Sequence, residues 1–170
     1  MKTPIDFYWF SGTGNTLLAV NRMAEIFRKS GSEVFLHKIE KTKSEEISLD
    51  NIIGLAFPVA YQSTYPVVWN FINKLPKTGK ETRIFMVDTL MAFSGGVVGP
   101  LRAILQKKGY RTIGAKEISM PNNFLPVKVN PDNNRKKVGK GLLAAEEYAH
   151  SILRGTSRWG RIPLLSDLIF

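Results

Sequence analysis

Apolar and polar positions alternate along the first three-quarters of the chain in a pattern that predicts strands separated by helices. Short β-branched and aromatic runs predict strands at residues 5–10, 33–38, 52–57, 83–88 and 112–120. Apolar residues at helical spacing predict helices at residues 15–29, 66–75, 97–108 and 138–153. Strands that alternate with helices form a parallel sheet covered on both faces, and right-handed crossovers restrict its topology. The pattern therefore predicts an α/β fold with a doubly wound five-stranded parallel sheet.

The chain divides into a domain over residues 1–155 and an apolar, basic C-terminal tail over residues 156–170. We expect the 138–153 helix to cover the sheet on the side of the first and fifth strands, and Gly155 to end it. The tail either folds back on the domain or leaves an apolar surface that docks a partner. Its apolar residues are Trp159, Ile162, Leu164, Leu165, Leu168, Ile169 and Phe170, and its basic neighbours are Arg154, Arg158 and Arg161.

The amino-acid composition argues against several kinds of functional site. The chain has no Cys and two widely separated His, His37 and His150, so a disulfide scaffold, an iron–sulfur cluster and a Cys- or His-rich metal site are not expected. No Ser/His/Asp arrangement for nucleophilic catalysis is visible either, and we assign no catalytic residue. No apolar run reaches the ~20 residues of a membrane span, and no secretory signal precedes the first strand. We expect a cytoplasmic protein without a membrane span.

Charge is the unusual feature of the composition. The 24 Lys and Arg exceed the 14 Asp and Glu, which gives a net charge of +10. The excess is densest in residues 128–170, where eight basic residues face four acidic ones. Such a field favours an anionic partner: nucleic acid, a membrane surface, a phosphorylated ligand or an acidic protein.

The loop after the first predicted strand carries the most informative chemistry. It contains Ser11, Gly12, Thr13, Gly14, Asn15 and Thr16, between an apolar strand and an amphipathic helix. Hydroxyls, an amide and glycine-exposed backbone N–H groups at a helix N-terminus suit a phosphate group. The loop lacks the Lys of a Walker A motif, and Leu17 stands where a dinucleotide fingerprint has its third Gly. The alternative is an ordinary strand-to-helix turn with a hydroxyl N-cap.

The run Phe10-Ser-Gly-Thr-Gly-Asn-Thr16 resembles the flavin mononucleotide (FMN) phosphate loop of flavodoxins, whose pattern is Thr/Ser-x-Thr-Gly-Asn-Thr. Segments 57–66 and 93–96, after the third and fourth strands, strengthen the resemblance. It covers about residues 4–127, and it is closest to flavodoxin-like domains fused to or associated with bacterial two-cluster ferredoxin modules. The resemblance implies the strand order 2-1-3-4-5, with FMN at the carboxyl ends of strands 1, 3 and 4.

The same resemblance implies two loops that hold the flavin rings. Tyr61 is the first candidate for covering a ring face and Tyr65 the second, although either one could pack on the sheet instead. Thr89 is expected near the ribityl chain or the pyrimidine edge, and Phe93 either closes the other ring face or folds onto the core. Unlike the usual flavodoxin loops, this one has no Gly from Pro58 through Pro66. The full set implied for the two loops is Pro58, Val59, Ala60, Tyr61, Thr89, Phe93, Ser94, Gly95 and Gly96. The stretch Met120-Pro-Asn-Asn-Phe124 after the fifth strand is similar to the Met-Pro-x-Asn-Tyr/Phe stretch of the ferredoxin-linked family and is a last candidate segment for ligand contact.

The interpretation that these observations favour is an FMN-binding electron-transfer protein that exchanges electrons with a ferredoxin-type iron–sulfur partner. An NAD(P)H-dependent flavin or quinone reductase on the same fold is the alternative, so the sequence leaves open whether the chain is a carrier or an oxidoreductase. A non-redox domain that binds RNA or an anionic membrane is a further alternative. Its Lys and Arg are spread along the chain without interleaved stacking aromatics, so we expect no nucleic-acid partner.

Overall fold

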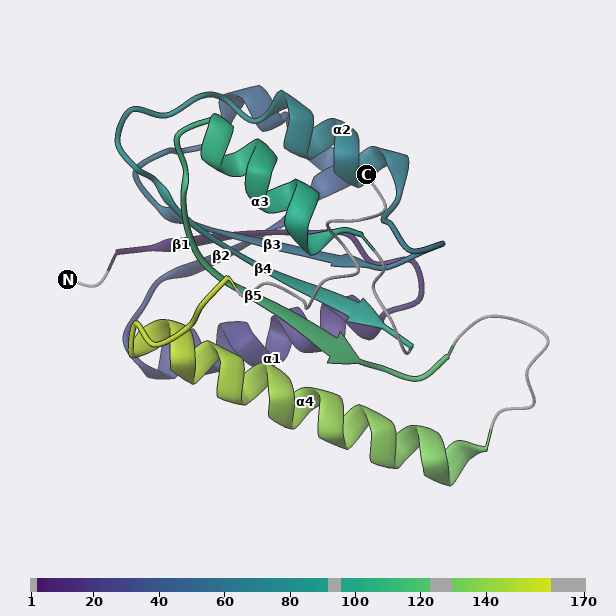
Figure 1. Cartoon of the computed structure of the whole chain (residues 1–170). Coiled ribbons are helices and arrows are strands. Elements are labelled where there is room, and N and C mark those ends of the chain that lie inside the picture. Colours follow the sequence, from purple (N-terminus) through teal and green to yellow (C-terminus); the bar gives the residue numbers. More distant parts are fainter. Residues whose placement is uncertain (1–2, 92–95, 123–129, 160–170) are drawn as a thin grey trace.

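The computed structural model describes residues 3–91, 96–122 and 130–159, and it shows strands and helices in alternation (Figure 1). The strands are β1 (Ile5–Trp9), β2 (Val34–Lys38), β3 (Ile52–Pro58), β4 (Arg83–Leu90) and β5 (Arg111–Ser119). The helices are α1 (Asn15–Lys29), α2 (Pro66–Lys74), α3 (Val98–Lys107) and α4 (Pro131–Leu153), with short 3₁₀ turns at Ile39–Lys41 and Ser44–Glu46. Every predicted element is present, and most boundaries shift by only one or two residues.

All five strands are parallel and follow the order β2-β1-β3-β4-β5, which confirms the predicted doubly wound fold. Ile5 of β1 lies beside Val34 of β2 on one side and Ile52 of β3 on the other. The strand order reverses next to β1, so the loops after β1 and β3 leave the same edge of the sheet in opposite directions. In open α/β sheets this switch point is where ligands bind.

The helices cover both faces of the sheet (Figure 1), with α1 and α4 on one face and α2 and α3 on the other. The α1/α4 side buries Phe7 and Phe85, whose rings meet edge to face with centroids 5.2 Å apart. Gly54 makes this contact possible, because a Cβ there would lie 2.6 Å from both rings. The α2/α3 side is a separate apolar layer that includes Leu55, Phe57 and Met86.

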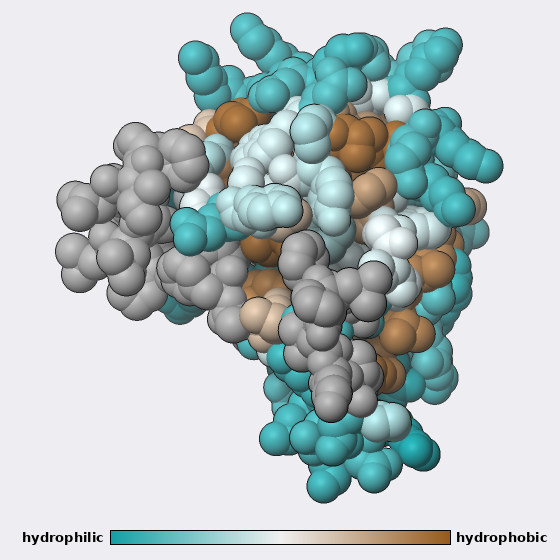
Figure 2. Space-filling view, turned by 90° about the vertical axis from the view of Figure 1, so that its right-hand side faces the viewer, coloured by the Kyte–Doolittle hydropathy of each residue, from teal (hydrophilic) through white to brown (hydrophobic). Residues whose placement is uncertain are grey.

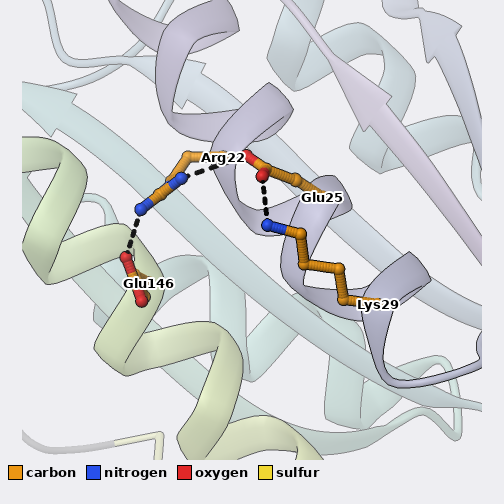
Figure 3. A network of polar contacts seen from close by, with 4 residues as sticks. All are labelled: Arg22, Glu25, Lys29 and Glu146. Carbon is orange, nitrogen blue, oxygen red and sulfur yellow. Dashed lines mark hydrogen bonds and ion pairs between the residues drawn. The ribbon is translucent and has the colours of Figure 1, made fainter.

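A polar network joins the two helices of the first face (Figure 3). The Arg22 guanidinium on α1 donates to Glu146 on α4 at 2.6 Å and to Glu25 on its own helix at 3.0 Å. Lys29 donates to the other Glu25 oxygen at 2.6 Å. The hydrogen bond from Lys29, followed by that from Arg22, lowers the pKa of Glu25. The network fixes the register of α1 and α4, and these exposed pairs contribute little else to stability.

Helix α4 lies beside α1 and packs on β5, as expected, but it begins seven residues before the predicted position. The Asn130 side chain caps it by accepting from the backbone N–H groups of Asp132 and Asn133 at 3.0 and 3.1 Å, and Pro131 occupies the first turn. The apolar periodicity misses this start, because the first turns contact little of the core. The capping signal Asn-Pro-Asp was present in the sequence.

The chain after α4 crosses the free edge of β5 to the opposite face of the sheet. Ser157 Oγ donates to the Ile113 carbonyl at 2.7 Å, and the Arg158 carbonyl accepts from Ala115 N at 3.2 Å. The Trp159 side chain is buried in the α2/α3 layer, where its indole N–H donates to the Val98 carbonyl at 3.1 Å. The tail was expected either to fold back on the domain or to dock a partner, and Trp159 folds back on the domain. The other tail residues, 160–170, lie outside the described residues.

Candidate functional site

The loop that joins β1 to α1 is shaped by a bond between its own residues. Ser11 Oγ accepts from the backbone N–H of Gly14 at 3.1 Å. Gly14 has φ +99°, a left-handed conformation that side chains disfavour, and it precedes the first residue of α1. The first helical hydrogen bond runs from Leu18 N to the Gly14 carbonyl at 3.0 Å. The loop therefore turns abruptly and presents the N-terminus of α1 at the carboxyl edge of the sheet.

This helix N-terminus is suited to an anion. Within the part of the chain that the structure describes, α1 has no side-chain cap at Gly14, and its first turn contains no acidic residue. A Cβ at Gly12 or Gly14 would meet no atom within 4 Å, so the space above the loop is open. The first-turn N–H groups and the positive end of the helix dipole together attract negative charge. Phosphate is a natural occupant of such a turn.

Two contacts tie the loop to the ends of β4 and β5. Thr16 Oγ1 and Thr89 Oγ1 share a buried hydrogen bond of 2.7 Å. The Asn15 side-chain amide donates to the Pro121 carbonyl at 3.0 Å. Asn15 and Thr16 were both expected to contact a ligand, and the structure shows that each also holds the loop against the sheet.

A cavity of about 470 Å³ opens where these loops meet, a volume within the range of cofactor sites. Of the implied site residues, it is lined by Ser11, Gly12, Thr13, Asn15, Thr16, Pro58, Val59, Ala60, Tyr61 and Thr89. It is also lined by Tyr65 and by five residues outside the implied set, Leu90, Met91, Met120, Pro121 and Asn122. Met120, Pro121 and Asn122 belong to the candidate segment 120–124 after the fifth strand, whereas Leu90 and Met91 were not singled out, although the carboxyl ends of all parallel strands share one edge.

The remaining implied residues have other positions. Gly14 shapes the turn but does not line the cavity. Gly96 is buried, and its N–H donates to the Gln62 carbonyl at 3.0 Å, so it connects the loops after β3 and β4. Phe93, Ser94 and Gly95 lie outside the described residues.

The loop after β3 holds Tyr61 at the rim of the cavity. Ala60 and Ser63 exchange backbone hydrogen bonds of 2.8 and 2.9 Å across a tight turn, and Tyr61 and Gln62 both have positive φ, 49° and 61°. That conformation is strained for residues other than Gly. The Tyr61 side chain is 94% exposed, so its ring is free to cover a flat ligand. Tyr65 is less available, because its ring packs on Phe10 with centroids 5.0 Å apart.

No charged side chain lines the described part of the cavity. Asp88 precedes Thr89 but is fully buried, and neither of its carboxyl oxygens has a hydrogen-bond partner among the described residues. Burial, and secondly the neighbouring Glu117, raises the pKa of Asp88 well above its usual value and so favours the neutral acid. Lys137 brings a cation to the rim, where its Nζ donates to the carbonyl of the lining residue Met91 at 2.9 Å. The electrostatics of the cavity therefore favour an anionic ligand.

The polar groups that could perform acid–base chemistry lie elsewhere. His37 contacts Asp6 at 2.8 Å and stacks on Tyr8 on the β2 side of the sheet, and Asn51 donates to the other Asp6 oxygen. Neither His37 nor His150 is among the residues that line the cavity.

The described residues contain no group of three His, Cys, Asp or Glu placed to hold a metal ion. They also contain no helix that is long and apolar enough to cross a membrane. The cavity can hold a ligand, and its described residues offer hydrogen bonds and an aromatic face.

No known family is matched by the sequence, and no curated protein is matched by it either. Solved structures do resemble the fold. The two-electron reduced flavodoxin of Megasphaera elsdenii aligns with a TM-score of 0.62 and 21% identity, over 84% of this chain and 98% of that one. A Fusobacterium nucleatum flavodoxin mutant bound to FMN aligns with a TM-score of 0.60 and 17% identity, over 89% and 96%. A short-chain flavodoxin associated with a bacterial microcompartment gives 0.65 and 12%, over 92% and 100%. At these identities the comparisons show that the chain has the flavodoxin-like fold.

Proposed function

We propose that this chain binds FMN at the carboxyl edge of its sheet and exchanges electrons with an iron–sulfur partner. The observation that carries the proposal is the N-terminus of α1, which faces a cavity of about 470 Å³ between four loops whose described lining has no charged side chain. The FMN-bound flavodoxin of similar fold supports the choice of ligand. When bound, FMN would supply reversible electron transfer in one- or two-electron steps.

The residues present fit the parts of FMN. The phosphate would receive hydrogen bonds from the N-terminal turn of α1 and from the hydroxyls and amide of the 11–16 loop. The flat ring system would lie between the loops after β3 and β4, with the exposed Tyr61 ring against one face. Val59 N donates to the Thr89 carbonyl at 2.9 Å, which holds these two loops together.

A carrier role is supported by what surrounds the cavity. Its described lining contains no Asp, Glu, His or Lys to move a substrate proton. The net charge of +10 suits an acidic protein partner, and ferredoxin-type proteins are acidic as a class. An iron–sulfur protein is therefore the partner we propose.

Titration calorimetry with FMN, riboflavin and FAD tests the ligand. FMN should bind far more tightly than riboflavin, because only FMN carries the terminal phosphate. Thr13→Ala combined with Asn15→Ala should weaken FMN binding by several kcal/mol, at ~1.5–3 kcal/mol for each hydrogen bond to a charged group. Thr42→Ala, on an exposed loop that does not line the cavity, is the matched control. Equal affinity for riboflavin and FMN would refute the phosphate site.

The reductant distinguishes a carrier from a reductase. FMN-loaded protein should be reduced by a reduced ferredoxin and should stay oxidised with NADH or NADPH alone. Rapid bleaching of the flavin absorbance by either nicotinamide would establish the reductase instead.

A further inference from the structure

The N-terminal part of α4 extends beyond the sheet. Gly141 lies against the end of β5, where an added Cβ would be 2.8 Å from Met120 Sδ and 3.0 Å from the Ser119 carbonyl. Ten helical residues, 131–140, precede it. At a rise of 1.5 Å per residue they reach about 15 Å past this contact, on the carboxyl side of the sheet. Figure 1 shows this projection, and in Figure 2 hydrophilic residues cover the corresponding lower protrusion.

This projection is basic. It carries Arg135, Lys136, Lys137 and Lys140 against one acidic residue, Asp132, which pairs with Arg135 at 3.3 Å. Lys136 and Lys140 are exposed, and neither has an ion-pair partner among residues 3–91, 96–122 and 130–159. They lie four positions apart on one helix, so they share a face.

Apolar side chains accompany these charges. Leu143 is 61% exposed and lies three residues after Lys140, on the same face of α4. Leu18 on α1 is 44% exposed and lies about one turn before Arg22. On α4, Leu143 likewise lies about one turn before Glu146. Because Arg22 and Glu146 are paired, the two leucines lie at a similar level of the adjacent helices. Exposed apolar residues within a charged rim are typical of protein docking surfaces.

The projection also borders the cavity. Lys137 Nζ donates to the carbonyl of Met91, a lining residue whose side chain is 54% exposed. A protein bound to the projection would therefore lie at the mouth of the cavity.

We infer that the basic projection of α4 (residues 131–140), together with the adjacent Leu143, is the docking surface for an acidic protein that carries a redox centre. This inference rests on the proposed function, because it places the electron-transfer partner beside the flavin. Lys136, Lys140 and the exposed Leu143, which share one face of α4, complement an acidic protein surface with an apolar contact. A single-stranded nucleic acid is disfavoured, since residues 130–143 contain no aromatic side chain on which bases could stack.

The test is the double charge reversal Lys136→Glu/Lys140→Glu. The matched control is Lys77→Glu/Lys107→Glu, which changes the net charge equally. These two exposed lysines precede β4 and β5, so they lie toward the amino ends of the strands, whereas the cavity lies at the carboxyl ends. The probe is an acidic ferredoxin with two [4Fe–4S] clusters, and its binding to each variant is measured with and without FMN.

At low ionic strength the α4 reversal should weaken ferredoxin binding and slow flavin reduction by about tenfold or more. At about 0.5 M salt the difference from the wild type should largely disappear, because exposed charges are then screened within a few ångströms. The control reversal should change both quantities far less.

Equal losses in the two variants would mean that net charge alone matters, and this would overturn the docking surface. Unchanged ferredoxin binding in the α4 variant would overturn it as well. The same holds if the α4 variant loses binding to a single-stranded RNA 20-mer but still binds ferredoxin. Because ferredoxin binding is also measured without FMN, failure of the docking surface is distinguishable from failure of the proposed function. The latter would show as absence of FMN binding in the wild type.

Discussion

Thr16 and Thr89 share a buried hydrogen bond of 2.7 Å between their hydroxyl oxygens, although 73 positions separate them. Thr16 lies in the first turn of α1, and Thr89 lies near the end of β4. One hydroxyl donates to the other, so the pair retains one O–H that can donate elsewhere. Since both residues line the cavity, this bond connects the helix that would hold a phosphate to the loop that would hold a ring system.

Replacing both members of this pair by their isosteres should cost less than the sum of the two single replacements. Thr16→Val or Thr89→Val leaves a buried hydroxyl without its partner, which costs about 1–3 kcal/mol. The double variant leaves no orphaned hydroxyl, so its loss should be smaller than the sum of the two single losses. Urea unfolding of the four proteins measures the free energies. Additive losses would mean that the hydrogen bond contributes nothing.

The buried carboxyl of Asp88 should make the stability fall as the pH rises. Burial and Glu117 raise its pKa in the folded state, so above pH ~4 the folded protein retains a proton that the unfolded chain has lost. The free energy of unfolding then decreases with pH until the raised pKa is passed. Asp88→Asn imitates the neutral acid and does not titrate. Its stability relative to the wild type should therefore increase from pH 4 to pH 8.

Glu117→Gln provides the comparison for Asp88. Glu117 is the register partner of Asp88 on β5, and removing its charge should reduce the pH dependence only in part, because burial is the larger cause. Thermal unfolding of the three proteins across this pH range checks the order. A wild-type pH dependence that is retained in Asp88→Asn would show that Asp88 is ionised when folded.

Trp159 should be a core residue rather than part of a dispensable tail. Its side chain is 8% exposed and packs in the α2/α3 layer. Trp159→Ala should cost about 3–5 kcal/mol, the usual range for removing a buried aromatic ring. Trp159→Phe keeps a ring but loses the hydrogen bond to Val98, at ~1 kcal/mol. Chemical denaturation measures both, and an unchanged midpoint in Trp159→Ala would exclude this role.

Tyr61 should quench bound flavin without supporting the fold. Tyr61→Ala should increase the fluorescence of bound FMN and cost roughly 1 kcal/mol of affinity, because an aromatic contact with the rings is lost. Its unfolding midpoint should not fall, since the side chain is 94% exposed. Fluorescence that stays quenched in Tyr61→Ala but increases in Tyr65→Ala would assign the contact to Tyr65.

The turn at Tyr61 should also be more stable with glycine. Tyr61 has φ 49°, a region that costs non-glycine residues about 1 kcal/mol or more. Tyr61→Gly should therefore raise the free energy of unfolding of the FMN-free protein relative to Tyr61→Ala, which keeps the strained backbone and also lacks the ring. Differential scanning calorimetry of the two variants compares them. A lower stability of the glycine variant would mean that the turn is not strained.

Local periodicity was sufficient to predict the layers of this fold. The apolar run at residues 52–57 and the helical spacing at residues 15–29 each specify an element through contacts close in sequence. Crossover handedness then restricts how such elements assemble. The start of α4 was missed for the same reason, because its first turns extend past the core and carry no apolar stripe.

The sequence by itself determined the sheet, its order as implied by the resemblance, and the loop from Ser11 to Thr16, because strand pattern, glycine placement and helix capping are local. Tertiary structure alone decided which distant residues meet at the cavity. Asn15 donates a hydrogen bond to Pro121, and Lys137 donates one to Met91. These residues are far apart in the sequence, so a local pattern of apolar positions does not predict the contacts. It also buried Trp159 on the α2/α3 face of the sheet and left the Asp88 carboxyl without a hydrogen-bond partner among the residues that the structure describes. These outcomes depend on packing and desolvation, which arise only once the elements have assembled.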